Sequence, residues 1–229
     1  MDPDTLLDFL RSRATVRSFE NRPIPRQTLA RVLEAATRAP SPTNRQPWRF
    51  TVVTAPSLMR RIIQATQESI DEVRGAIAKG PKPDHLSGYW DFFVKPLQSA
   101  TAFVAGQYRL LPDSIGTMIA DAGGDARAYD TCERWNAELC STSAAMMQLL
   151  LQAHAEGLGA CWMSGFLLAR ERISELLRIR PPWKMLGGVA LGWPAEKPAP
   201  QPRKPLEKVV EWLDEDRVSS ADDAGGTAP

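Results

Sequence analysis

Arg13-Ala14-Thr15-Val16-Arg17-Ser18-Phe19 is the stretch on which the interpretation of this chain depends. Two guanidinium groups stand four residues apart with the hydroxyl of Thr15 between them. Arginine forms bidentate, charge-assisted hydrogen bonds to phosphate oxygens, and a hydroxyl adds a neutral donor. A short amphipathic helix is predicted just before the stretch, from Leu6, Leu7, Phe9 and Leu10. By itself the stretch therefore indicates either a phosphate site or a solvated basic helix end favoured by the helix dipole.

A second informative stretch is the loop Ala39-Pro40-Ser41-Pro42-Thr43-Asn44-Arg45-Gln46-Pro47-Trp48. Its three prolines lower the entropy of the free loop, so its polar groups can be held ready for a polar heterocycle at little ordering cost. The alternative is an ordinary turn in which Ser41 and Asn44 satisfy their own backbone. The loop alone does not decide between these two hypotheses.

Hydrophobic periodicity predicts alternating helices and strands on both sides of one poorly patterned region. Between Lys79 and Tyr129 the pattern is mixed, and only a strand at Ala102–Ala105 is predicted there. The other predicted helices are Arg26–Arg38, Ser57–Ala78, Asn136–Glu156 and Ala169–Leu177, and the other predicted strands are Arg49–Thr54, Gly159–Met163 and Met185–Leu191.

The predicted helix Asn136–Glu156 is apolar almost all round, with Ala144, Met147, Leu150 and Leu151 among its apolar positions. Such a helix is usually buried in the centre of a domain or in an interface. After it, the proline-rich stretch Pro194–Pro205 predicts an extended connector. Leu206–Leu213 is expected to form one last ordered element, followed by a flexible tail over residues 218–229.

The composition excludes several classes of function. With 28 Lys and Arg against 27 Asp and Glu, the net charge of +1 gives no field that favours nucleic acid or an anionic membrane. No stretch reaches the roughly 18 apolar residues of a membrane span, and the acidic N-terminus is unlike a secretory signal. We therefore expect one soluble, cytoplasmic domain. The odd number of cysteines (Cys132, Cys140 and Cys161) fits a reducing compartment and buried free thiols.

Other cofactor and catalytic patterns are poorly matched. Gly157-Leu158-Gly159 begins like a dinucleotide fingerprint, but Trp162 stands where a small residue is required. His85 and His154 are far apart and beside no cysteine pair, so no zinc ligand set, and no metal site, is predicted. No G-x-S-x-G elbow is present. His154 is expected to be a hydrogen-bonded histidine and not a catalyst.

Four segments, in this order, resemble the FMN-dependent nitroreductase family: RATVRSF, APSPTNRQPWRF, GLGACWMSGF, and LGGVALGWPAEKP followed by PRKPLEKVV. The resemblance implies an α+β fold with a mostly antiparallel central sheet enclosed by helices, in an intertwined homodimer. It implies a single FMN-binding domain over residues 1–217, with a variable inserted region near 79–130. The C-terminal segment Leu206–Leu213 would cross to complete the sheet of the partner.

The resemblance also implies which residues contact FMN. Arg13, Thr15 and Arg203 would contact the phosphate, and Arg17 would lie near the N1–C2 edge of the isoalloxazine. Pro40, Ser41 and Asn44 would contact the ribityl chain and flavin of the neighbouring subunit, and the backbone at Met163, Ser164 and Gly165 would approach N5. The family usually has Arg-Arg-Ser at Arg13-Ala14-Thr15, so Ala14 lies in the cofactor-binding stretch but lacks one basic contact.

The implied activity is hydride transfer from NADH or NADPH through flavin N5 to a nitro compound, a quinone or a related aromatic acceptor. The cofactor carries this chemistry, so no catalytic side chain is required. Two alternatives stay open: a flavin-dependent oxidase or dehydrogenase that desaturates a metabolite, and a non-catalytic flavin-binding protein. Aromatic residues that could form a substrate lid or pack in the core are Trp90, Phe92, Phe93, Tyr108 and Tyr129.

Overall fold

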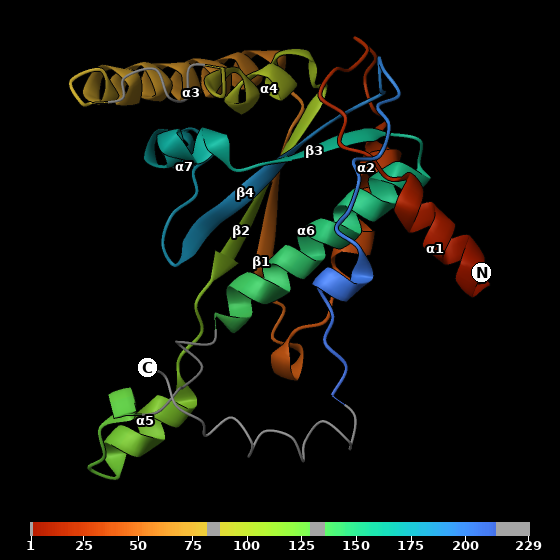
Figure 1. Cartoon of the computed structure of the whole chain (residues 1–229). Coiled ribbons are helices and arrows are strands. Elements are labelled where there is room, and N and C mark those ends of the chain that lie inside the picture. Colours follow the sequence, from red (N-terminus) through yellow and green to blue (C-terminus); the bar gives the residue numbers. More distant parts are fainter. Residues whose placement is uncertain (1, 82–87, 129–135, 214–229) are drawn as a thin grey trace, which may run out of the picture. The chain divides into compact units, whose positions relative to one another are not determined.

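A computed structural model describes residues 2–81, 88–128 and 136–213 of the chain (Figure 1). The chain divides into two units, Met1–Ala199 and Pro200–Pro229, each of which is described by itself. The first unit contains a four-stranded sheet in the order β1-β2-β4-β3, in which every neighbouring pair is antiparallel. Its strands are β1 (Trp48–Val53), β2 (Ala102–Arg109), β3 (Gly159–Met163) and β4 (Trp183–Gly192). The predicted α+β fold with an antiparallel sheet is confirmed.

Helices cover both faces of this sheet (Figure 1). Successive side chains of a strand point to opposite faces, so β2 contributes Phe103 and Ala105 to one apolar cluster and Ala102 and Val104 to the other. The first face is covered by α3 (Pro56–Ile77), α4 (Lys95–Ser99) and α7 (Arg170–Leu176), and the second by α2 (Arg26–Ala36) and α6 (Ala137–Ala155).

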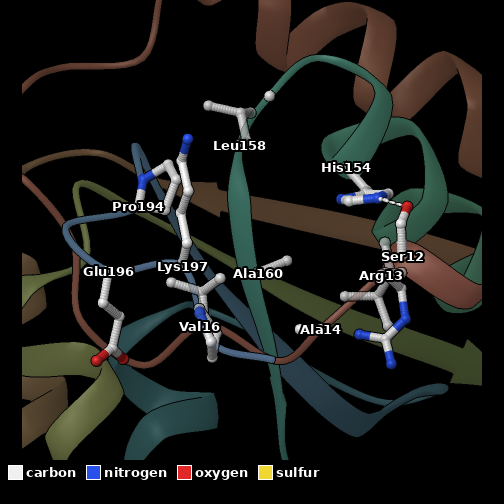
Figure 2. A pocket seen from close by; sticks show the side chains of 13 residues that line it. Ser12, Arg13, Ala14, Val16, His154, Leu158, Ala160, Pro194, Glu196 and Lys197 are labelled. Atoms are coloured by element: carbon white, nitrogen blue, oxygen red, sulfur yellow. Dashed lines mark hydrogen bonds between the residues drawn. The ribbon is translucent and has the colours of Figure 1, made fainter. Parts of the chain in front are cut away.

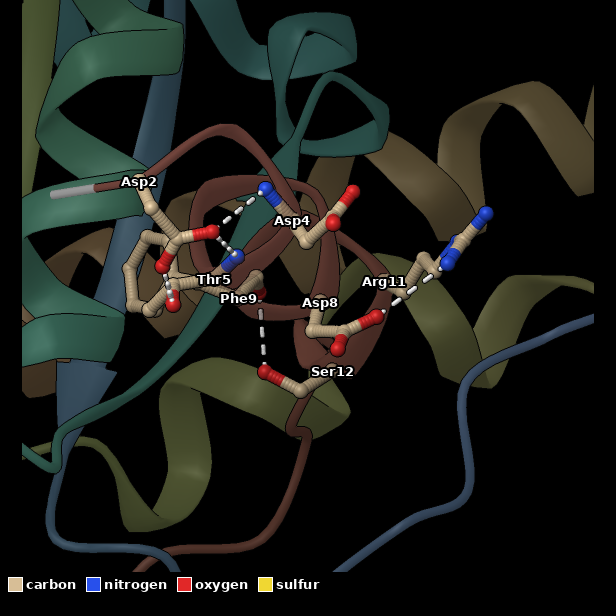
Figure 3. Close-up of polar contacts among 7 residues, drawn as sticks. All are labelled: Asp2, Asp4, Thr5, Asp8, Phe9, Arg11 and Ser12. Atoms are coloured by element: carbon tan, nitrogen blue, oxygen red, sulfur yellow. Dashed lines mark hydrogen bonds and ion pairs between the residues drawn. The ribbon is translucent and has the colours of Figure 1, made fainter.

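The N-terminal helix α1 (Pro3–Ser12) shows clear capping but no burial (Figure 3). The carboxylate of Asp2 accepts hydrogen bonds from the backbone N–H of Asp4 at 3.0 Å and of Thr5 at 3.2 Å, and from the Thr5 hydroxyl. The helix buries no residue, and its exposed apolar side chains are Leu6, Leu7 and Leu10. Of the apolar residues of α1, Phe9 packs against His154 with 5.0 Å between ring centroids, whereas the three leucines are exposed.

Helix α6 is mostly buried, but a few of its side chains are exposed among the described residues. Met146, Leu149 and Ala153 are fully buried against the sheet, whereas Met147 is 38% exposed and Cys140 is also exposed. The expected burial of free thiols is thus wrong for Cys140, which is one of these exposed side chains, and right for Cys161 on β3. Cys132 lies outside the described residues. At the end of α6, the Glu156 carboxylate pairs with Arg31 of α2 at 2.7 Å.

The region between Lys79 and Tyr129 contains more structure than its pattern predicted. Its described parts hold η2 (Trp90–Phe93), α4, α5 (Ser114–Asp121) and η3 (Ala126–Ala128). The strand predicted at Ala102–Ala105 continues to Arg109, because the polar Gln107 is buried and donates to the Thr51 hydroxyl of β1 at 2.7 Å. Periodicity could not detect this continuation, since Gln107 breaks the apolar run.

Two predicted elements near the C-terminus are shorter than expected. The helix predicted at Ala169–Leu177 is confirmed as α7, which is one residue shorter at each end and follows a 3-10 turn, η4 (Gly165–Ala169). In the second unit, the element predicted at Leu206–Leu213 contains only η5 (Leu206–Lys208), and its residues are almost all exposed. The predicted tail 218–229 lies outside the described residues. Among those described, no helix is long and apolar enough to cross a membrane.

The packing between strands and helices makes Gly188 of β4 a sensitive position. A methyl group at Gly188 would overlap the buried ring of Phe103, whereas a methyl group at Gly75, in helix α3, meets nothing within 4 Å. We expect Gly188→Ala to lower the free energy of unfolding by about 1–3 kcal/mol, as overpacked cores do. Gly75→Ala should raise it by up to about 1 kcal/mol, because alanine favours helix. Urea unfolding of both variants measures this, and equal stabilities would contradict it.

Candidate functional site

The segment RATVRSF, the first of the four motifs, lies beside GLGACWMSGF, the third, which contains strand β3. The backbone N–H of Val16 donates to the Ala160 carbonyl of β3 at 3.1 Å. The Val16 side chain is buried in the space that a side chain at Gly159 would need, since a Cβ there would lie 2.7 Å from it. Glycine at the start of β3 is therefore what allows the N-terminal segment to dock on the sheet.

The same N-terminal segment also contacts the chain that follows β4. The backbone N–H of Glu20 donates to the Trp193 carbonyl at 2.8 Å, and that of Ala195 donates to the Ser18 carbonyl at 3.0 Å. RATVRSF, GLGACWMSGF and LGGVALGWPAEKP are thus brought together by backbone pairing, although about 140 residues separate the first two.

Arg17 is exposed and faces the third motif. Its guanidinium carbon lies 5.6 Å from the centroid of the Phe92 ring. Burial raises the pKa of the Cys161 thiol on β3, and the positive charge of Arg17 acts in the opposite direction. Among the described residues, no carboxylate forms an ion pair with Arg13 or Arg17. Both charges are therefore available to an anionic ligand.

The end of β3 presents backbone and a glycine. Met163 is buried, Ser164 is exposed, and Gly165 begins η4. A side chain at Gly165 would overlap the ring of Phe93, so only glycine allows this approach. Because Phe92 and Phe93 are consecutive, η2 contacts both Arg17 and Gly165. This arrangement was not predicted, since the sequence gives the aromatic residues but not their neighbours.

A cavity of about 290 Å³ lies next to the first motif (Figure 2). Arg13 and Ala14 line it, whereas Thr15 and Arg17 do not. His154 of α6 also lines it, with Nε2 2.8 Å from the Ser12 hydroxyl oxygen. That hydroxyl donates to the Phe9 carbonyl, so Nε2 is the donor to Ser12. His154 is thus hydrogen-bonded, as predicted.

The loop Pro40–Pro47 is held in an unusual conformation. Thr43, Asn44 and Gln46 have positive φ values of 49°, 55° and 45°. Such residues cost about 1–3 kcal/mol each and are concentrated at functional sites. The Ser41 hydroxyl accepts from the Gln46 N–H at 3.0 Å, and the Gln46 side chain donates to Asn44 at 3.1 Å. Pro40 is exposed. The loop therefore satisfies its own polar groups while holding backbone strain.

The structure does not bring this loop to Arg17 and Gly165 within one chain. The loop precedes β1, Gly165 follows β3, and these strands are the opposite edges of the sheet. Three strand spacings of about 4.8 Å separate the edges by about 14 Å. Arg203 belongs to the second unit, where it is exposed just before η5. In the part of the chain that is described, no group of three or more metal-ligating side chains occurs.

The fold and this site place the chain among α+β proteins that present arginines on a segment docked to an edge strand, β3, whose end carries an exposed residue and a glycine. A family model described as "Nitroreductase family" matches residues 10–193, which include the region around 79–130 that the four motifs do not cover. The chain belongs to this family.

Similar proteins agree with this assignment. An "NADH dehydrogenase" of Thermus thermophilus is 32% identical over 203 residues, which are 87% of this chain and 92% of that protein. The crystal structure of a BluB-like flavoprotein from Clostridium difficile 630 has a TM-score of 0.82 at 22% identity, covering 93% of this chain and all of that one. A nitroreductase with bound FMN from Desulfitobacterium hafniense has a TM-score of 0.68 at 18% identity, with coverage of 93% and 100%.

The environment of His154 predicts that the stability of the folded chain depends on pH. Burial, and then the charge of Arg13, lower the pKa of His154 in the folded chain. The unfolded chain therefore takes up the proton first, near pH 6.5, so stability falls as the pH decreases from there through the lower folded pKa. We expect His154→Gln to reduce this loss. Unfolding midpoints measured from pH 8 to pH 5 test it, and identical pH profiles would contradict it.

Proposed function

We propose that this protein is an FMN-dependent oxidoreductase that passes hydride from NADH or NADPH to a nitro compound, a quinone or a related aromatic acceptor. The observation that carries the proposal is that Arg17 and Gly165 both contact the aromatic residues of η2, next to the end of β3. The chain that has this arrangement is a member of the Nitroreductase family. The bound FMN of a similar nitroreductase and the name of the NADH dehydrogenase relative support it.

The donor set fits the phosphate of FMN. Arg13 and Thr15 lie on the segment that docks on β3, and Arg13 has no carboxylate partner among the described residues. A guanidinium and a hydroxyl are suitable donors to a phosphate dianion. We infer that Arg203 supplies a further guanidinium. Ala14 supplies no charge at the position where the family usually has arginine, so fewer cations hold the phosphate here.

Arg17 and the backbone at the end of β3 are suited to the flavin ring. Bound FMN would supply the hydride chemistry at N5. Arg17, which has no carboxylate partner in the described part of the chain, would stabilise the negative charge that the reduced ring carries at its N1–C2 edge. The backbone at Met163, Ser164 and Gly165 would contact the N5 side, where the absence of a side chain at Gly165 permits close approach. The residues of this chain thus orient and stabilise the cofactor without a general acid.

We further propose a homodimer in which Pro40, Ser41 and Asn44 of a second copy complete each site. Their strained loop lies at the sheet edge opposite Gly165, which one chain cannot bridge. Apolar side chains without cover in one chain would be buried in the dimer; they are Leu6, Leu7 and Leu10 of α1, Met147 of α6, and Leu206, Val209, Trp212 and Leu213 of the second unit. A permanent dimer of this kind buries more than about 2,000 Å².

The remaining parts of the proposal concern organisation and location. We infer that residues 1–217 act as one FMN-binding domain, with the C-terminal segment crossing to the partner and the variable region near 79–130 shaping acceptor choice. A cytoplasmic location would give the enzyme access to reduced nicotinamide nucleotide. The partners in catalysis are then small planar molecules, and neither nucleic acid nor a membrane is required.

The visible spectrum tests the proposed function. We expect the purified protein to be yellow, with about one FMN per chain, and the flavin to be bleached rapidly by NADH or NADPH without oxygen. Colourless protein that takes up no FMN on titration would exclude a flavoprotein. Bound flavin that neither nucleotide reduces would favour the oxidase or the non-catalytic alternative.

Alanine variants of Arg17 and Arg203 should have different defects, because the two side chains are assigned to opposite ends of FMN. Arg203→Ala removes charge-assisted hydrogen bonds worth about 1.5–3 kcal/mol, so FMN affinity should fall by about one to two orders of magnitude. Arg17→Ala should instead lower the flavin midpoint potential, where about 30 mV corresponds to 1.4 kcal/mol for two electrons.

The control for Arg203→Ala is Lys204→Ala, which removes an adjacent exposed charge and should leave FMN affinity nearly unchanged. FMN dissociation constants and midpoint potentials of all three variants are the measurements. An unmoved potential in Arg17→Ala, or equal affinities in Arg203→Ala and Lys204→Ala, would refute the corresponding role.

A further inference from the structure

A second cavity, of about 600 Å³, lies where strand β1 ends and strand β2 begins. Thr54 directly follows β1, Thr101 directly precedes β2, and both residues line the cavity. The first turns of α3, the segment 19–24 and the end of α4 supply the other walls. None of the residues assigned to FMN lines this cavity, so it is separate from the proposed flavin site.

The cavity has an apolar floor and a polar rim. Ile24, Met59 and Leu97 line it and are buried, whereas Asn21 and Gln98 line it and are exposed. Small-molecule sites of proteins have volumes of about 300–1,000 Å³ and combine a mostly apolar lining with a few polar groups. The cavity is therefore suited to a molecule that has an apolar body and one polar head.

The charge at the rim is positive. Among the described residues that line the cavity, Arg60 alone is charged, and it is exposed and forms no ion pair with the described carboxylates. The helix that carries Arg60 begins at the same cavity with Pro56, and its N-cap residue Ala55 gives it no side-chain cap. The positive end of the helix dipole therefore adds to the charge of the guanidinium, and both favour an anionic head.

Thr101 adds a hydroxyl that has no partner. Its oxygen is buried, and no described residue forms a hydrogen bond with it. The backbone N–H of Thr101 donates to the Leu191 carbonyl at 3.0 Å, which fixes the residue at the start of β2. The neighbouring Ser99 hydroxyl, in contrast, accepts from the Phe19 N–H at 3.2 Å. Buried hydroxyls without a protein partner usually bond to a water or to a ligand, so Thr101 is a donor available to an anion.

We propose that this cavity is a second ligand site, which binds a monocarboxylate with an apolar body, such as a medium-chain fatty acid. The carboxylate lies beside Arg60 and the Thr101 hydroxyl, and the apolar body covers the buried floor. One guanidinium matches a singly charged carboxylate, with which it forms paired, charge-assisted hydrogen bonds. The inference goes beyond the proposed function and does not depend on it.

Calorimetry with octanoate and 1-octanol tests the site in the full-length protein as purified. Octanoate should bind at one site per chain, and octanol, which has the same apolar body without the charge, about tenfold more weakly or less. Arg60→Gln should weaken octanoate binding by about ten- to hundredfold and leave octanol binding unchanged. The matched control is Arg61→Gln, which removes the adjacent exposed arginine of α3 that lines a different cavity and should change neither affinity.

Thr101→Val tests the hydroxyl separately. This variant keeps the shape of the side chain and should bind octanoate about three- to tenfold more weakly. Because the hydroxyl has no partner in the protein, the urea midpoint of Thr101→Val should equal or exceed that of the wild type. A lower midpoint together with unchanged octanoate affinity would show that the hydroxyl has a structural role and would refute its assignment to the ligand.

Methyl resonances locate the bound probe. Octanoate should shift the methyl signals of Ile24 and Ile63, which line the cavity, and leave that of Ile173 in α7 unchanged. Absence of binding, or equal octanoate affinities in Arg60→Gln and Arg61→Gln, would overturn the proposal. So would octanoate binding that is lost in Arg17→Ala and kept in Arg60→Gln, since the probe would then occupy the flavin site. Octanoate binding by protein that takes up no FMN would refute the proposed function alone.

Discussion

The docking of the N-terminal segment on strand β3 is the constraint on which the site depends. One backbone hydrogen bond, from Val16 to Ala160, and one side chain seated on Gly159 fix the register between them. This register places Arg17 beside Cys161 and within reach of Phe92. A one-residue slip would turn Val16 to the exposed side and bring Thr15 or Arg17 to the buried position, which is unfavourable because both side chains are polar.

The same docking explains why the cations of the motif remain free. Val16 is buried, whereas Arg17 is exposed and has no carboxylate partner among the described residues. Cations that have no carboxylate partner among the described residues, on a segment docked to strand β3, are available to an anion, because no ion pair has to break before the anion binds. The sheet thus provides, at one edge, the elements that the proposed chemistry needs: charge, exposed backbone and a glycine.

Local pattern was enough to predict most of the sheet and the long helices. Alternating and continuous apolar runs marked β1, β3 and β4, and the apolar periodicity of α2 and α6 gave helix boundaries within about two residues. Contacts between distant segments could not be predicted this way. The proximity of Phe92 to Arg17, the exposure of Cys140 and the burial of Gln107 each depend on which element packs where. Only the order of four motifs, through a resemblance, indicated the site residues.

The central claim is that each flavin site is assembled from opposite sheet edges of two chains. Heterodimers formed from an Arg17→Ala chain and an Asn44→Ala chain, isolated with two different affinity tags, test it most directly. If the sites are shared, one of the two sites in each heterodimer keeps both Arg17 and Asn44, so about half of the bound flavin should be reduced by NADH at the wild-type rate. If each site is built within one chain, no site is intact and no such fraction appears, which would contradict the account.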